Sequence, residues 1–309
     1  MVRLMLALRS NSSFVLWVAL EFNMIRFLPL MSFRGLKILE ASIKYFLIQS
    51  LSSAMFLLCL ILGLFLSKRA LTWGIILRMA IKLGSAPFHL WFLSLISTLH
   101  LWVLFILCTV QKVIPVLVIS TLSPPLLFLY IIILMNMAVV FSRGLVITSF
   151  NIIMALSRIN NLRWMLLGLR DGLLITSLYF LIYAFLIYGI LVLFWNPMSR
   201  GPSQLLMANY RLRITVLLTI FSLAGLPPLL GFLSKLLVIK QTFLVANPYL
   251  VICIVFSSLI VLTYYVGFRY TRVIFVPRMK RALPTKNLSF HKGLYTVVLL
   301  GFRVLRVMY

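Results

Sequence analysis

Apolar runs of roughly twenty residues follow one another along nearly the whole of this chain, with short polar connections between them. The hydrocarbon core of a bilayer is about 30 Å thick, and about 20 helical residues cross it. Within lipid, a spanning segment must satisfy its backbone hydrogen bonds internally, which an α-helix does. The pattern therefore predicts an all-α polytopic membrane protein, organised as a single transmembrane domain over residues 1–309.

We expect about ten transmembrane helices from these runs. Their approximate ranges are 13–32, 41–66, 71–92, 98–119, 125–141, 146–168, 173–195, 212–246, 249–268 and 293–309. Composition agrees with this class, because 63% of the residues are hydrophobic and only 10% are charged, too few to cover a soluble domain. Residues 1–13 contain an apolar stretch of only about five residues, shorter than the core of a cleavable signal, so no signal is expected.

The charge balance is strongly basic, with 29 Lys or Arg residues against three acids, Glu21, Glu40 and Asp171. Many of the basic residues lie in the short connections, where the positive-inside bias and lipid headgroups explain them better than nucleic acid does. We therefore expect lipids as partners and no nucleic acid. The basic residues gather in the odd-numbered connections, most densely at 269–292, which predicts that these connections face the side of synthesis and both termini the opposite side.

The chain offers no ligand set for a redox cofactor or a metal. Cys59, Cys108 and Cys253 each stand alone within an apolar run, and the sequence has no CxxC pair, no HExxH and no glycine-rich phosphate loop. We interpret the cysteines as small apolar residues and expect no cofactor in this chain. If the protein belongs to a redox enzyme, other subunits carry out the redox chemistry.

Two of the apolar segments are interrupted, one at Gly84–Pro87 and one at Gly225–Gly231. Proline inside a helix removes a backbone hydrogen bond, and in lipid such a break survives only where protein or water satisfies the freed groups. Lys82 lies just before the first break and Lys235 just after the second. This pairing is typical of an inverted-repeat transporter whose discontinuous helices carry the transport site. The simpler alternative is two unrelated kinks with lysines that snorkel to the headgroups.

Ionisable side chains within apolar runs are functional candidates, because a charge at bilayer depth is costly unless it faces a polar interior. The candidates are Glu21, Lys82, Lys112 and Lys235. An amine suits proton transfer because burial favours its neutral form and a nearby carboxylate favours its charged form. The alternatives are a snorkelling role for Lys112 and Lys235 and a structural hydrogen-bonded role for Glu21.

Two histidines are further candidates. His89 follows the first break, where a ring nitrogen can either relay protons or satisfy a freed backbone group. For His100 we expect a structural role.

Several stretches, in one order, carry a resemblance to a known family. They are Trp17–Met24, Glu40–Phe46 with Gln49-Ser50, Lys82–Trp91, Gln111-Lys112 with Pro115, and Gly225–Phe232 followed by Lys235. At these residues the chain resembles the antiporter-like membrane subunits of mitochondrial respiratory complex I. The resemblance implies that Glu21 and Lys82 interact, that Lys112 is the central relay lysine, and that Lys235 is the distal site. We expect Glu21 and Lys82 to lie within direct or single-water reach, since an isolated charge is costly in hydrocarbon.

The sequence departs from the family pattern at several places. The family usually has an acid shortly after the stretch that ends at Trp91, where this chain has Phe92-Leu93-Ser94. Arg158 and Arg163 stand where small residues are expected. Because mitochondrial codes differ in reading AGA and AGG, we predict serine or glycine at such positions in the native protein. A helix that normally precedes the Glu21 segment is reduced here to residues 1–13.

With these residues, the resemblance implies a proton-translocating subunit of complex I in the mitochondrial inner membrane, which supports electron transfer from NADH to ubiquinone. Its partners would be the other membrane subunits, with no small-molecule substrate besides protons. Two alternatives stay open, an independent cation/proton antiporter and a non-transporting structural membrane subunit.

Overall fold

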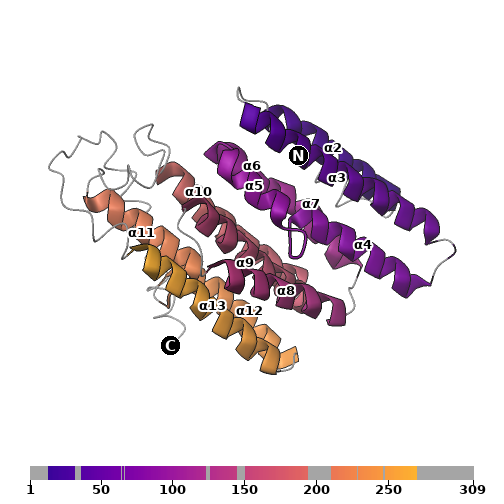
Figure 1. Cartoon of the computed structure of the whole chain (residues 1–309). Coiled ribbons are helices and arrows are strands. Elements are labelled where there is room, and N and C mark those ends of the chain that lie inside the picture. Colours follow the sequence, from indigo (N-terminus) through magenta and orange to yellow (C-terminus); the bar gives the residue numbers. More distant parts are fainter. Residues whose placement is uncertain are drawn as a thin grey trace. The chain divides into compact units, whose positions relative to one another are not determined.

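The computed structural model describes residues 13–31, 36–63, 65, 67–122, 126–144, 150–193, 210–227, 229–245 and 248–269. Every regular element that it describes is an α-helix. The helices are α2 (Ser13–Met31), α3 (Leu36–Leu62), α4 (Lys68–Leu83), α5 (Leu90–Thr98), α6 (Leu101–Cys108), α7 (Val110–Thr121), α8 (Leu126–Gly144), α9 (Phe150–Asp171), α10 (Leu173–Leu193), α11 (Tyr210–Ala224), α12 (Leu230–Val245) and α13 (Pro248–Arg269) (Figure 1). The chain divides into two compact units, residues 1–139 and 140–309.

In the first unit, α3 packs against α2, α4 and α5, while α7 packs against α2, α4 and α6. Figure 1 shows α2 and α3 lying side by side. Helix α3 buries Ala41, Tyr45 and Gln49, which share one face because they are four residues apart. The opposite face exposes large apolar side chains such as Ile43 and Leu47, as expected of a helix that faces lipid or another membrane protein.

The first predicted break separates α4 from α5. Gly84 ends α4 with a φ of 67°, a conformation that glycine adopts without a steric penalty. Beyond it, the backbone N–H and the hydroxyl of Ser85 both donate to the carbonyl of Ala80. The N–H of Ala86 donates to Oδ1 of Asn136 on α8, at 2.7 Å. Side chains and turn bonds therefore satisfy backbone groups that the break frees, as a membrane interior requires.

Two features of the first unit differ from the prediction. The sequence predicts a segment that ends at residue 92, whereas in the structure helix continues beyond the break as α5 to Thr98. The segment expected at 98–119 is itself interrupted at Thr109, whose φ of −112° and ψ of −78° divide α6 from α7. Pro115 lies inside α7 one turn later, and it has no N–H for the carbonyl of Gln111. The helix is thus weakened on both sides of Lys112, and only the proline gave a sequence signal.

In the second unit, α10 packs against α9, α11 and α12, and α13 packs against the same three neighbours of α10. Helix α9 is buried at every position from Ala155 to Leu169. The second predicted break lies between α11 and α12, where Gly225 has a φ of 86° and its N–H bonds to the carbonyls of Phe221 and Ser222. Gly231, in the first turn of α12, lies so close to Ser222 that an added Cβ would overlap the Ser222 carbonyl oxygen. Glycine is needed there because the two half-helices meet through their backbones.

Most predicted segments match observed helices to within a few residues, and α3 begins earlier than predicted, at Leu36. Four helical stretches in the described part of the chain are long and apolar enough to cross a membrane on their own. They are Phe14–Met31, Leu36–Leu62, Leu101–Thr121 and Leu173–Val192. The predicted segment 293–309, the basic connection 270–292 and residues 1–12 lie outside the described residues. The structure is therefore that of an all-helical membrane protein with several apolar spans.

Candidate functional site

Lys82 and Lys112 line one small cavity inside the first unit. The cavity lies among α2 to α7, and its polar lining residues are Asn23, Gln49, Lys82, Gln111 and Lys112. Its volume is about 20 Å³, and a polar cavity of roughly 10–15 Å³ already holds one water molecule. Two of the sequence-predicted lysines therefore meet at a site that has both the polarity and the room for a bridging water.

Lys82 lies in the last turn of α4, directly before the first break. Only 8% of this residue is exposed, and its backbone carbonyl accepts a bond of 3.3 Å from the amide of Gln49 on α3. The carbonyls at a helix C-terminus carry partial negative charge, which favours an ammonium at this position. The break thus places a cation where the end of its own half-helix stabilises it.

Glu21, on α2, is half-buried and interacts electrostatically with Lys82. The structure gives no direct ion pair between these two described residues. Their direct or water-bridged contact stays a prediction, since a charge interaction at longer range is compatible with one intervening water.

Lys112 is 3% exposed and belongs to the first turn of α7. Its Nζ lies 5.8 Å from the centroid of the Phe92 ring, a distance at which an aromatic face attracts a cation. The preceding residue, Gln111, exchanges two hydrogen bonds with α2. Nδ2 of Asn23 donates to Oε1 of Gln111 at 2.6 Å, and Nε2 of Gln111 donates to the Asn23 carbonyl at 3.2 Å.

Lys235 lies in the second unit, on α12, and is 4% exposed. Its Nζ donates a short hydrogen bond to the carbonyl of Ala224, the last residue of α11, and lies 5.7 Å from the Trp164 ring centroid. The amine therefore reaches back across the second break to the C-terminal carbonyls of the preceding half-helix. Gly225 leaves room for this reach, because a Cβ there would come within 2.7 Å of the Lys235 Nζ.

Polar side chains of α9 form hydrogen bonds with α10 and α13 in the second unit, which also contains Lys235. Tyr179 donates to Oδ1 of Asn161 at 2.8 Å. Arg163, wholly buried, donates to Ser257 and Asn160 at 2.5 and 2.6 Å and interacts electrostatically with Lys235. Among the described residues, Arg163 forms no ion pair with a carboxylate. A buried guanidinium beside a buried ammonium is costly without such a partner.

The two histidines occupy different environments. His89 is buried directly after the first break, and its Nδ1 lies 3.1 Å from the carbonyl oxygen of Pro87. This contact is the one expected of a residue that stabilises the break, and a relay role for His89 stays a prediction. His100 is exposed at the N-cap of α6.

Sequence reasoning missed two residues of the first unit. Asn136 is 0% exposed and holds the break through Ala86, and Asn23 links α2 to α7. Both are lone asparagines within apolar runs, and that was the available signal, because an amide at bilayer depth is expensive unless it is hydrogen-bonded. The prediction considered only ionisable groups and so passed over them.

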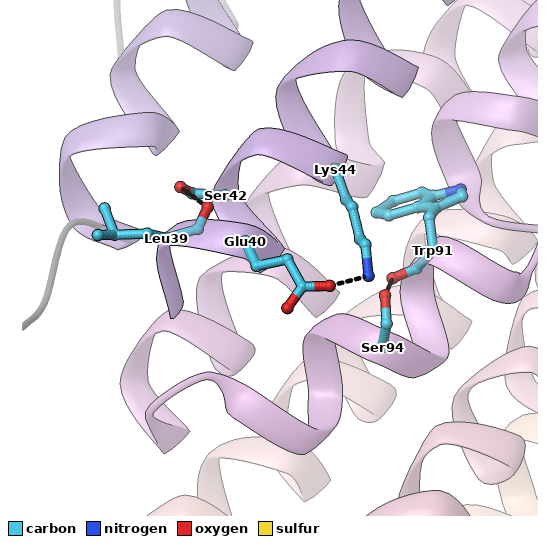
Figure 2. A network of polar contacts seen from close by, with 6 residues as sticks. All are labelled: Leu39, Glu40, Ser42, Lys44, Trp91 and Ser94. Atoms are coloured by element: carbon cyan, nitrogen blue, oxygen red, sulfur yellow. Dashed lines mark hydrogen bonds and ion pairs between the residues drawn. The ribbon is translucent and has the colours of Figure 1, made fainter. Parts of the chain in front are cut away.

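Glu40 and Lys44 form an exposed ion pair of 2.5 Å, one turn apart along α3 (Figure 2). At 1.5 Å per residue, Glu40 lies about 33 Å along the helix from Leu62. This length matches the thickness of the hydrocarbon core, so an α3 that crosses the bilayer with Leu62 at one boundary would carry the pair to the other, where headgroups and water solvate charges. Its position separates it from the buried lysines.

Residues 10–261 match the family model described as NADH:quinone oxidoreductase/Mrp antiporter, TM. NADH-ubiquinone oxidoreductase chain 2 of Anopheles gambiae is 34% identical over 280 residues, covering 86% of this chain and 82% of that protein. Chain 2 of Mus musculus is 31% identical over 303 residues, covering 92% and 85%.

Solved structures share the fold. A chain of respiratory complex I from Thermus thermophilus with bound Aureothin matches with a TM-score of 0.79 at 20% identity, covering 94% of this chain and 73% of that one. A chain of the Mrp complex from Dietzia sp. DQ12-45-1b matches with a TM-score of 0.76 at 16% identity, covering 88% and 59%. With the extent of the family match and the identity to the insect proteins, the chain belongs to the family of NADH-ubiquinone oxidoreductase chain 2, an antiporter-like membrane subunit of respiratory complex I.

Proposed function

We propose that this chain translocates protons in the membrane arm of complex I of the mitochondrial inner membrane, and that Glu21, Lys82, Lys112 and Lys235 carry them. The observation that supports this most is the placement of buried lysines at helix breaks in each unit. Lys82 and Lys235 both lie against the C-terminal end of a half-helix, and Lys112 shares a cavity with Lys82. Costly charges at such places are expected of a transport pathway rather than of a structural spacer.

The chemistry asked of this chain is proton transfer alone. A buried amine takes up and releases a proton as its surroundings change, and a water in the cavity joins Lys82 to Lys112. Glu21 favours the charged form of Lys82 when it approaches. When Glu21 withdraws, Lys82 gives up its proton more readily. We propose that the chain holds no cofactor, and that the driving energy comes from quinone chemistry in other subunits of the complex, which are its partners.

We further propose one antiporter-like domain, residues 1–309, of about ten spans arranged as an inverted repeat. The packing within each unit supports a repeat. In the first unit, α3 contacts the helix before it and both halves of the broken helix α4–α5. In the second, α10 contacts the helix before it and both halves of the broken helix α11–α12. Each unit thus contains two packed helices followed by a broken helix that carries a buried lysine.

The membrane orientation follows from the loop charges. We propose that the basic connection near residues 269–292 faces the matrix and that both termini face the intermembrane space. Limited proteolysis of mitoplasts checks this orientation, since a protease added from the intermembrane side should leave the connection intact. Cleavage there from that side would reverse the topology.

The function is tested by replacing Lys235 with methionine, which keeps much of its volume and removes the titrating amine. The assembled complex is expected to lose proton translocation, and electron transfer should slow with it. Lys240→Met is the matched control, because Lys240 lies on the same helix and is exposed. If the assembled Lys235→Met complex kept a normal ratio of protons to electrons, Lys235 would have a structural role and would not carry protons.

The family model names the Mrp antiporter beside the quinone oxidoreductase, and this keeps an independent cation/proton antiporter as the second candidate. The two candidates differ in partners and in driving force. A complex I subunit co-purifies with NADH-oxidising activity and moves protons only during NADH oxidation. An antiporter moves protons against a sodium gradient in liposomes without NADH.

A further inference from the structure

Two neutral amides join α2 to α7 at the cavity that holds the lysines. Nδ2 of Asn23 donates to Oε1 of Gln111 at 2.6 Å, and Nε2 of Gln111 donates to the backbone carbonyl of Asn23 at 3.2 Å. Asn23 lies two residues after Glu21, and Gln111 directly precedes Lys112. Both amides line the cavity shared with Lys82. The bonded pair therefore connects the helix of the acid to the helix of the second lysine.

The hydrogen bonds from Asn23 reach α7 at the turn where this helix is least regular. Thr109 divides α6 from α7 two residues before Gln111, and Pro115 has no N–H for the Gln111 carbonyl. A helix turn with a break on one side and a proline on the other depends on contacts with its neighbours for its position. The bonds from Asn23 come from α2, so a movement of α2 is passed to this turn.

We propose that Asn23 and Gln111 are positioning residues that couple the state of Glu21 and Lys82 to the protonation of Lys112. This inference rests on the proposed function and adds a link to it. While the amides are paired, the first turn of α7 keeps Lys112 against Phe92 and at the cavity wall. When α2 shifts with the charge state of Glu21, the paired amides shift α7 with it. Neither amide exchanges a proton itself.

The link predicts a specific pattern among variants. Asn23→Leu and Gln111→Met are near-isosteric and remove the pairing, and each is expected to slow proton-coupled turnover of the assembled complex about tenfold, a loss of about 1.4 kcal/mol. The double variant should be no slower than the slower single variant, because both remove the same link. The pH profile of turnover should shift in all three, which a purely structural role would not cause.

An exchange of side-chain lengths gives a second test that keeps both positions polar. Asn23→Gln and Gln111→Asn each change the reach of one amide by one methylene, whereas the double exchange restores the combined reach. We expect each single exchange to be slow and the double exchange to be faster than either single exchange, because it restores the bond between the two side chains but not the bond to the backbone carbonyl of residue 23. This set also serves if the apolar variants do not assemble. Gln241→Met, on α12 in the second unit, is the control for loss of a glutamine.

Two outcomes overturn the inference. The first is that the two single effects multiply in the double variant, and the second is that turnover and its pH profile remain native in the singles. Failure of the link is distinguishable from failure of the proposed function through Lys112→Met. If that variant stops pumping while the amide variants behave as native, the lysine is a relay and the link is wrong. If Lys112→Met pumps normally, the proposed function itself fails.

Discussion

Replacing Gly225 with alanine perturbs the second break at a single point. Gly225 has a φ of 86°, and a Cβ added there would lie 2.7 Å from Nζ, 2.8 Å from Cδ and 2.9 Å from Cε of Lys235. These distances are shorter than any van der Waals contact, so something must move. The lysine side chain is flexible while the backbone is held by the turn, and the amine is therefore displaced from the Ala224 carbonyl.

Two contributions set the size of the effect. An L-residue in the left-handed region costs about 1–2 kcal/mol relative to glycine. Loss of a hydrogen bond from a charged group costs about 1.5–3 kcal/mol more when the amine finds no replacement. The sum, about 2.5–5 kcal/mol, is a large part of the stability of a typical domain. We expect the variant complex to assemble in reduced amount and to pump at a lower ratio of protons to electrons.

Gly172→Ala separates the two contributions. Gly172 also has a positive φ, 132°, but a Cβ there meets nothing within 4 Å. The assay is the amount of assembled complex on native gels together with the proton-to-electron ratio in reconstituted vesicles. We expect Gly172→Ala to lower the amount alone and Gly225→Ala to lower both quantities. If the two variants had the same proton-to-electron ratio, Gly225 would not be required to place the Lys235 amine.

Three further predictions concern other places in the chain. Gly231→Ala should reduce assembly more than either of these substitutions, as judged on native gels, because its Cβ would overlap the Ser222 carbonyl, which is backbone and cannot swing away. Asn136→Leu removes the acceptor from the Ala86 N–H and should destabilise the complex by about 1–3 kcal/mol, seen as a lower temperature of thermal inactivation. Peptide masses from the native protein should show serine or glycine at positions 158 and 163, because Arg163 is buried without a carboxylate partner among the described residues. Masses that contain both arginines would contradict this prediction.

The sequence was sufficient for the positions of most helices and for both glycine–proline breaks. Apolar length and proline placement are local properties, and these decide where a helix can cross lipid or must stop. The interruption at Thr109 was not predictable in the same way. Threonine also occurs within regular helices, and the local pattern does not reveal that its hydroxyl here donates to the carbonyl of Phe105 and that its φ and ψ leave the helical range.

For the site, the sequence indicated Lys82, Lys112 and Lys235, and all three are buried beside helix breaks. Which groups meet across helices depends on packing that no local pattern records. The cavity shared by Lys82 and Lys112, and the bond from Lys235 to Ala224, became visible only in three dimensions. The expected approach of Glu21 to Lys82 has an electrostatic interaction in its favour, and its closer form stays a prediction.

The central claim is that Lys112 relays protons, and Lys112→Met tests it most directly. Methionine keeps much of the side-chain volume in this buried position, so the complex should assemble at native levels. Lys37→Met, an exposed position on α3, is the control and should change little. The measurement is the ratio of protons moved to electrons transferred in vesicles that contain the purified complex. Our account predicts a lower ratio with slower NADH oxidation for Lys112→Met, and a native ratio in the assembled variant would contradict it.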